Sequence, residues 1–184
     1  MSAEKPVKKY KMVIVGEAAV GKTSMTQRYL TGVFEVSTLM TIGFDFHVKR
    51  LTVDEKYIGL QIWDFAGEAQ FRFLLKDVLM NTDGVVFMYD ITRSATFKNL
   101  QEWIDIYNEI NLKRMTKAPA ILVGAKSDLK DDRIIFESQV KKKLDLWGMQ
   151  DFLECSSITG DNIPEVFESI TRIMMIQDGL IKEK

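Results

Sequence analysis

The sequence has few of the features that stabilise secreted proteins or anchor membrane proteins. Cys155 is the only cysteine in 184 residues, so no disulfide can form within the chain, and its apolar surroundings predict that it is buried. No run reaches the roughly 18 consecutive apolar residues of a membrane-spanning helix. The first residues are charged and lack the apolar core of a signal peptide. We therefore expect a cytoplasmic protein.

The chain also lacks a charge bias. Its 25 Lys and Arg nearly balance its 26 Asp and Glu, giving a formal net charge of -1, so nucleic acid is not an expected partner. A local cluster of Lys5, Lys8, Lys9 and Lys11 is better explained as the solvated start of a strand. No cysteine lies near Lys184, so no C-terminal lipid anchor is expected if this is the native end.

What the chain does have is an alternation of apolar runs and amphipathic segments. The predicted strands cover residues 10–15, 44–53, 57–63, 84–89, 120–124 and 152–154. The predicted helices cover residues 23–30, 71–80, 94–110 (with Ser94 as a cap), 138–147 and 164–175. Loops are expected at 31–40 and 64–69, and a hairpin turn at 54–56. The pattern is typical of one α/β domain over residues 1–184, with short flexible ends and a doubly wound, mostly parallel six-stranded sheet that has one antiparallel edge strand.

One loop carries the clearest chemical signal. Residues 16–23 follow an apolar run and open a predicted helix, which is the context of a phosphate-binding P-loop. Gly16 and Gly21 let the backbone turn tightly, so that successive N–H groups and the helix N-terminus face an anion. Lys22 can reach the β- and γ-phosphates, and the Thr23 hydroxyl can bind Mg²⁺. The expected nucleotide contacts here are Glu17, Ala18, Ala19, Val20, Gly21, Lys22, Thr23 and Ser24.

A second turn, from Asp64 to Gly67, follows the third predicted strand. At such a strand end an Asp can hold Mg²⁺, usually through water, and the N–H of Gly67 can meet a γ-phosphate. Asp and Gly are common in turns. The interpretation therefore depends on the P-loop that precedes this turn in the chain.

With these motifs, residues 9–175 resemble the Ras-like small GTPases, and the Rab branch most of all. Residues 41–46, with the sequence Thr-Ile-Gly-Phe-Asp-Phe, resemble the Rab switch I segment, and Thr41 follows Lys22 at the family's interval. The resemblance implies that Thr41 binds Mg²⁺ through its hydroxyl and the γ-phosphate through its N–H. It also implies that Phe34 stacks on guanine, although a core or loop aromatic would explain Phe34 as well.

Residues 125–128, with the sequence Ala-Lys-Ser-Asp, resemble the family's guanine motif Asn-Lys-x-Asp. The two carboxylate oxygens of Asp128 match the N1–H and N2–H₂ donors of guanine, a pair that adenine lacks. Lys126 would lie along the base with its aliphatic stem. Ala125 departs from the family, because a methyl group cannot make the hydrogen bonds of an amide. Residues 154–160 resemble the family's Ser-Ala-Lys loop, which implies nucleotide contacts from Ser156, Ser157 and Ile158.

Glu68 stands where the family usually has its catalytic Gln. An ionised Glu can only accept hydrogen bonds, and its charge would face a negative phosphate. We expect this repulsion to favour an outward rotamer and slow hydrolysis; the alternative is a solvent-facing side chain without a role. The expected catalytic residues are Lys22, Thr41, Gly67 and Glu68, and the expected metal ligands are Thr23, Thr41 and Asp64.

The sequence thus predicts a monomeric Rab-like switch that binds GTP or GDP with Mg²⁺ and hydrolyses GTP slowly. Effector, exchange and activating proteins are expected at the switch loops, residues 35–43 and 67–76. A pseudo-GTPase binding module is one alternative. A P-loop kinase is another, but it would need a lid and an Arg-rich acceptor pocket that the sequence does not indicate. Phe46, Trp63, Val78 and Leu79 are expected to form either a surface patch or core, and His47 to be solvated on the hairpin.

Overall fold

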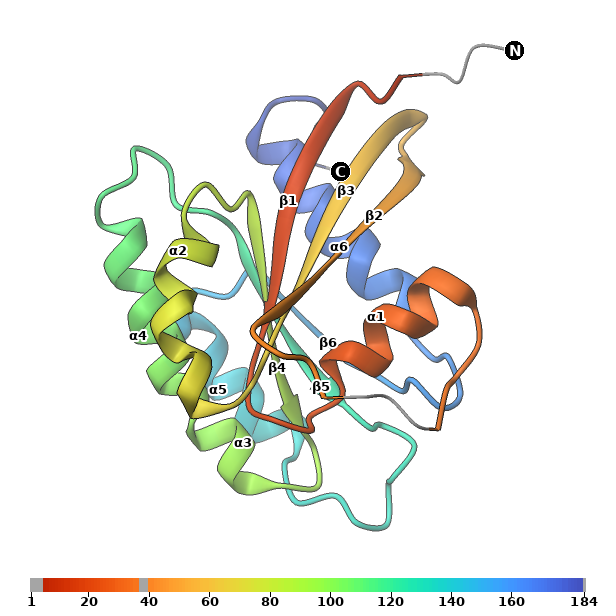
Figure 1. Ribbon diagram of the computed structural model, residues 1–184, viewed down its shortest axis with the longest axis vertical. Helices are drawn as coiled ribbons and strands as arrows, with labels where there is room; N and C mark the ends of the chain where they lie inside the picture. The colour runs from red at the N-terminus through yellow and green to blue at the C-terminus, as the bar shows by residue number, and fades with distance from the viewer. Residues whose placement is uncertain (1–4, 37–39, 184) are drawn as a thin grey trace.

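The computed structural model describes residues 5–36 and 40–183, so the predicted loop 31–40 lies partly outside the described residues. Within them a six-stranded sheet runs in the order β2-β3-β1-β4-β5-β6, with helices on both faces (Figure 1). Neighbouring strands are parallel, except that β2 and β3 form an antiparallel hairpin at one edge. The predicted sheet is confirmed. The strands are β1 (Lys8–Val15), β2 (Phe44–Val53), β3 (Lys56–Phe65), β4 (Gly84–Asp90), β5 (Ala120–Ala125) and β6 (Asp151–Cys155).

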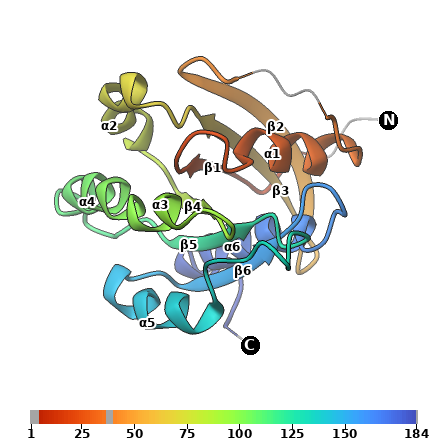
Figure 2. The same ribbon diagram turned by 90° about the horizontal axis from the view of Figure 1, so that it is seen from below.

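The helices form two layers, which Figure 2 shows on opposite sides of the sheet. Helices α2 to α5 pack on one face with Val13 and Val15 of β1, while α1 and α6 pack on the other with Met12 and Ile14. No helix among the described residues is long and apolar enough to cross a bilayer. The helices are α1 (Lys22–Thr31), the 3₁₀ helix η1 (Ala69–Leu74), α2 (Leu75–Leu79), α3 (Ser94–Lys98), α4 (Leu100–Asn111), α5 (Glu137–Trp147) and α6 (Ile163–Gln177).

Strand β1 is the point at which the strand order reverses, because it pairs with β3 on one side and β4 on the other. In open parallel sheets a crevice forms beyond the carboxyl ends of the strands at such a point. The P-loop lies there, since residues 16–21 connect β1 directly to α1. The strand order alone therefore places the candidate site at the carboxyl end of β1.

The structure corrects two predicted helices. Residues 71–80 form the end of η1 and one turn of α2, and residues 94–110 form α3 and α4, which meet at Asn99. Spacing cannot separate a 3₁₀ turn from an α-helical one, because both bring residues i and i+3 together. Ser94 does not cap α3, because Arg93 holds that position; the Thr96 hydroxyl instead donates to the Arg93 carbonyl and accepts from the Asp90 N–H.

Strands β3 to β6 continue past their predicted ends, and two of these extensions carry expected site residues. Asp64 lies within β3, opposite Asp45 of β2, and Ala125 lies within β5, opposite Asp90 of β4. Pairing with a neighbouring strand extends each one beyond its apolar run, so these residues start from rigid strands and not from loops. His47 is only partly exposed, with Nε2 lying 3.1 Å from the Asp45 carboxylate, so the expectation of a solvated histidine was wrong.

Gly16 tests how far the fold depends on close packing of the P-loop. Its φ is +148°, and a Cβ there would lie 2.1 Å from the Met88 carbonyl oxygen in β4. Gly16→Ala should lower the free energy of unfolding by about 2–4 kcal/mol, measured by urea denaturation in EDTA without nucleotide. Gly32→Ala is the matched control: its φ is +76° and no atom of the described residues lies within 4 Å of an added Cβ. It should lose only about 1 kcal/mol. Equal losses would show that the Met88 contact is unimportant.

Candidate functional site

The P-loop curves around the end of β1 through three residues with positive φ: Gly16, Ala19 and Gly21. Ala19 has a φ of 59°, which costs an alanine roughly 1 kcal/mol. Gly21 is the N-cap of α1, so the positive end of the helix opens into the loop. Backbone of this conformation is suited to presenting successive N–H groups to one anion, and the positive φ of Ala19 is part of it.

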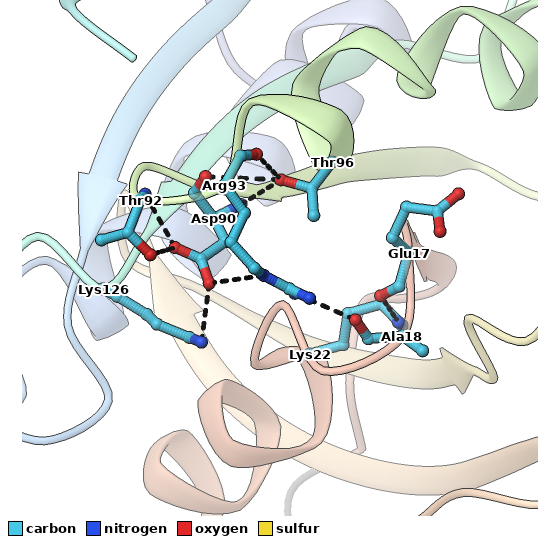
Figure 3. Close-up of polar contacts among 8 residues, drawn as sticks. All are labelled: Glu17, Ala18, Lys22, Asp90, Thr92, Arg93, Thr96 and Lys126. Atoms are coloured by element: carbon cyan, nitrogen blue, oxygen red, sulfur yellow. Dashed lines mark hydrogen bonds and ion pairs between the residues drawn. The ribbon is translucent and has the colours of Figure 1, made fainter. Parts of the chain in front are cut away.

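Lys22 is buried, and its ammonium is held by the loop itself. Nζ donates to the carbonyl oxygens of Gly16 and Glu17, each at 2.8 Å; Figure 3 shows Lys22 beside Glu17. Burial lowers the pKa of Lys22 to about 8, although the charges of Asp64, Glu68 and Glu17 act in the opposite direction. The ammonium remains charged at neutral pH, next to a helix N-terminus, and together they favour an anion.

The three oxygens expected to bind Mg²⁺ converge in front of the P-loop. Thr23 Oγ1 donates to Asp64 Oδ2 at 2.5 Å and lies 2.8 Å from Thr41 Oγ1, which is 3.4 Å from the same carboxylate oxygen. Neighbouring ligands of octahedral Mg²⁺ are about 3 Å apart, because each Mg–O bond is about 2.1 Å long. The spacing therefore fits one shared ion.

The burial and hydrogen bonding of the Asp64 carboxylate are also those expected of a cation ligand. Burial raises its pKa, although the hydrogen bond from Thr23 opposes the rise, and Oδ1 is buried without a hydrogen-bond partner among the described residues. A buried carboxylate oxygen without a donor is costly unless a cation or water supplies the contact. In the described part of the chain, no group of three His, Cys, Asp or Glu side chains is arranged to hold a metal ion. Hydroxyls would therefore have to complete this ligand set.

A cavity of about 300 Å³ joins the P-loop to both switch segments. It is lined by Ala18, Ala19, Gly21, Lys22, Thr23, Ser24, Met40, Thr41, Phe65, Ala66, Gly67, Glu68 and Lys126. Gly67 packs so closely that a Cβ there would lie 2.2 Å from the Ala18 nitrogen. Several expected contacts are not part of this lining. The Val20 side chain is buried in the core, and Phe34 is half-buried outside the cavity. The others outside the lining are Glu17 and the expected base contacts Ala125, Asp128, Ser156, Ser157 and Ile158.

Glu68 faces this cavity together with Lys22. Its Oε2 is buried without a hydrogen-bond partner among the described residues, and its charge acts on Lys22. The side chain therefore does not simply face solvent, and the rotamer expected opposite a bound phosphate stays a prediction.

The expected base-binding residues lie on two loops that are bonded together. Ser156 Oγ donates to Asp128 Oδ1 at 2.5 Å, and the Ser127 N–H donates to the Cys155 carbonyl at 3.0 Å. Ser156 thereby fixes the orientation of the carboxylate expected to bind guanine. On the same loop, the next two residues are the half-buried Ser157 and the exposed Ile158.

Sequence reasoning missed a buried carboxylate at the end of β4. Asp90 accepts hydrogen bonds from Lys126 Nζ at 2.7 Å, Arg93 Nε at 3.1 Å and Thr92 Oγ1 at 2.7 Å, and Arg93 Nη2 donates to the Ala18 carbonyl at 3.0 Å (Figure 3). A signal for Asp90 did exist, because it directly follows a buried run of a parallel strand, whose carboxyl end faces the crevice. No pattern in the sequence indicated Arg93.

Arg72 was missed as well. From η1 it binds Glu17 of the P-loop, with Nη2 and Oε1 2.9 Å apart, pairs with Glu102 of α4 and lies over the ring of Trp103, with Cζ 5.1 Å from the ring centre. Glu17 and Arg72 are 55 residues apart in the chain, so no local pattern predicts the pair. It joins the P-loop to the second switch segment.

The expected apolar patch is half correct. Phe46 of β2 is exposed and packs against Trp63 of β3, with ring centres 5.4 Å apart. Val78 and Leu79, both on α2, are buried in the core. Of the four expected residues, therefore, only the two on the β2–β3 hairpin contribute to an apolar surface.

Fold and site together define a P-loop GTPase of the Ras-like α/β type. The sequence profile of the Ras family matches residues 11–176, so the chain belongs to the Ras family. It is 34% identical to Ras-related protein RABA5c of Arabidopsis thaliana over 163 residues, covering 89% of this chain and 74% of that protein. It is 35% identical to RABA6b of the same plant over 161 residues, covering 88% and 69%. The chain is thus a Rab-like small GTPase, and the kinase alternative is dropped.

A further relative is much longer than this chain. The Ras and EF-hand domain-containing protein homolog of Mus musculus is 35% identical over 170 residues, which cover 90% of this chain and 27% of that protein. The match is therefore to about a quarter of the relative's length.

The lowered pKa of Lys22 predicts how nucleotide affinity depends on pH. Below pH 8 the lysine is charged with or without nucleotide, so affinity should not depend on its titration. A bound phosphate raises the pKa, so above pH 8 binding must take up a proton, and affinity should fall by up to about tenfold per pH unit. Fluorescent-GDP titrations from pH 7.5 to 9.5 measure this. Lys22→Arg, whose guanidinium stays charged, should show no such fall; parallel curves for both proteins would contradict the prediction.

Proposed function

We propose that the chain is a single GTPase domain that acts as a Rab-like switch, binds GTP or GDP with Mg²⁺, and hydrolyses GTP slowly. One observation carries the proposal: Lys22, Thr23 and Thr41 line one cavity, and both threonine hydroxyls bond to the buried Asp64 carboxylate. Catalysis of phosphoryl transfer consists mainly of positioning and charge stabilisation, and these are the groups it requires.

Each group has a distinct role in the proposal. Lys22 and the P-loop N–H groups bind the β- and γ-phosphates and stabilise charge that develops between them. Thr23, Thr41 and Asp64 hold Mg²⁺, which supplies positive charge to the phosphate oxygens when bound. The backbone N–H groups of Thr41 and Gly67 bind the γ-phosphate. Loss of that phosphate would release both switch loops.

We infer that guanine is the base. Asp128 offers two acceptors to the paired donors of guanine, and the 2.5 Å hydrogen bond from Ser156 supports a fixed carboxylate. Lys126 covers the base with its stem, and Phe34, Ser157 and Ile158 complete the surroundings as the family resemblance implies. Ala125 contributes only its backbone.

Ras-family proteins generally act with regulators and effectors. We propose that here the contacts are made by the switch loops, residues 35–43 and 67–76, because these segments would change with the nucleotide. Of the described part of these loops, Met40, Thr41, Gly67 and Glu68 line the cavity, so a partner bound there would sense its contents. We place this activity in a cytoplasmic monomer.

Glu68 favours a second candidate, a pseudo-GTPase that holds nucleotide without hydrolysing it. Its carboxylate faces the cavity, where a γ-phosphate would bring further negative charge. An attacking water would then lack the donor and acceptor pair that a Gln amide provides. The two candidate functions differ in the rate of GTP hydrolysis and not in the nucleotide that is bound.

Base selectivity tests the guanine proposal. GTP should bind at least about 100-fold more tightly than ATP, because a buried carboxylate left without its donors costs several kcal/mol. Calorimetry in Mg²⁺ with both nucleotides measures this ratio, and Asp128→Ala should reduce it towards one. Equal affinities in the wild type would remove the guanine assignment.

The effect of Glu68 on hydrolysis separates the two candidates. Single-turnover GTP hydrolysis in Glu68→Gln should be at least about tenfold faster than in the wild type, since the amide can orient the water without adding charge. Glu68→Ala is the matched control, which removes the charge without adding the amide. A wild-type rate no higher than that of free GTP would support the pseudo-GTPase. A wild type faster than both variants would make Glu68 catalytic and overturn the expected sign.

A further inference from the structure

Asp90 stands between two parts of the molecule that would hold opposite ends of a nucleotide. Its carboxylate is fully buried and binds Lys126 of the base segment through Oδ2 at 2.7 Å. The same oxygen accepts from Arg93 Nε at 3.1 Å, while Oδ1 accepts from the N–H and the hydroxyl of Thr92. Arg93 then donates from Nη2 to the P-loop carbonyl of Ala18 at 3.0 Å. Figure 3 shows this continuous path from Lys126 to the P-loop.

The contacts along this path are stabilised by the charges of Lys126, Asp90 and Arg93. Burial by itself would raise the pKa of Asp90, but hydrogen bonds from Lys126 and Thr92 outweigh burial and hold the pKa below its usual value. A buried carboxylate of this kind needs its cationic partners, because its solvation has been lost. Arg93 is half-exposed, yet two different nitrogens of its planar fork are fixed at once.

Position 125 lies beside this path. Ala125 and Asp90 are opposite each other at the carboxyl ends of β5 and β4, and the Ile91 N–H donates to the Ala125 carbonyl at 3.2 Å. The Ala125 methyl group is buried and can make no hydrogen bond. Of the two residues at these strand ends, only Asp90 of β4 has a polar side chain that can bond to its surroundings.

We propose that Arg93 is a positioning residue for nucleotide retention, which ties the Ala18 carbonyl to Lys126 through Asp90 and takes the place of the amide missing at position 125. The P-loop and the base segment are then held at a fixed separation, so that the phosphate and base contacts form together. This inference rests on the proposed binding of guanine nucleotide.

The direct test is the rate of GDP release. Arg93→Gln cannot pair with Asp90 as a charge, so fluorescent GDP should leave about ten times faster than from the wild type. Arg93→Lys keeps the charge but can reach only one of the two acceptors, so it should recover part of the loss. Arg50→Gln is the matched control, because Arg50 is exposed on β2 and its side chain makes no hydrogen bond or ion pair with any described residue. The rate of GDP release from this variant should equal that of the wild type.

A double-mutant cycle tests the link to position 125. Ala125→Asn should slow release at least about tenfold in the Arg93→Gln protein but no more than about twofold in the wild type, because there the tie already exists. Rescue of this kind is not expected if Arg93 only stabilises the fold. Equal effects in both backgrounds would overturn the link.

The outcomes distinguish this inference from the function on which it rests. A wild type that binds no GDP, or binds ADP equally well, overturns the proposed function and this inference with it. Normal GDP selectivity in the wild type, together with unchanged release from Arg93→Gln, overturns only the role of Arg93.

Discussion

The site depends on how closely the P-loop backbone can approach its neighbours. At Gly16 the loop lies against the Met88 carbonyl, and at Gly67 the second switch segment lies against Ala18; a Cβ at either glycine would be within 2.2 Å of backbone atoms. Because neither glycine has a side chain, the P-loop backbone can pack directly against the end of the sheet. Only in that position can Lys22 fold back onto the loop carbonyls while facing the cavity. The rest of the site is built on this backbone packing.

Charge balance is the second constraint. Each cation at the loop has an acidic neighbour: Arg72 binds Glu17, Arg93 and Lys126 share Asp90, and the Glu68 charge acts on Lys22. The region is therefore not a basic surface that would attract any polyanion, which agrees with a formal net charge of -1. Selectivity for a nucleotide must then come from geometry, with backbone N–H groups and one lysine converging on a small cavity.

The sequence was sufficient for the features that depend on local patterns. Continuous apolar runs predicted the buried strands β4 and β5, and the Gly-Lys-Thr loop between a strand and a helix predicted the P-loop. It was not sufficient where packing decides. The break at Asn99 lies inside one uninterrupted helical pattern, and η1 has the same spacing as an α-helix.

Long-range polar pairs were also beyond the sequence. Arg93 reaches a carbonyl 75 residues earlier in the chain, and carbonyls leave no trace in residue type. Asp90 was the exception that could have been found, since a carboxylate directly after a buried run of a parallel strand is expected at the crevice.

The two departures from the family lie in different parts of the site, so we expect them to affect different steps. Ala125 lies at the base segment, away from the cavity lining, whereas Glu68 lines the cavity next to Lys22. The GTP-bound state ends either by release of the nucleotide or by hydrolysis. If the Asp90 path retains nucleotide and Glu68 slows hydrolysis, both of these steps are slow. Such a switch would leave that state mainly when another protein acts on it. The Arg72–Glu17 pair, which joins the P-loop to the second switch segment, is a contact that such a protein would have to break to move that segment. Control of the switch would then depend on ion pairs around the P-loop more than on the chemistry at its centre.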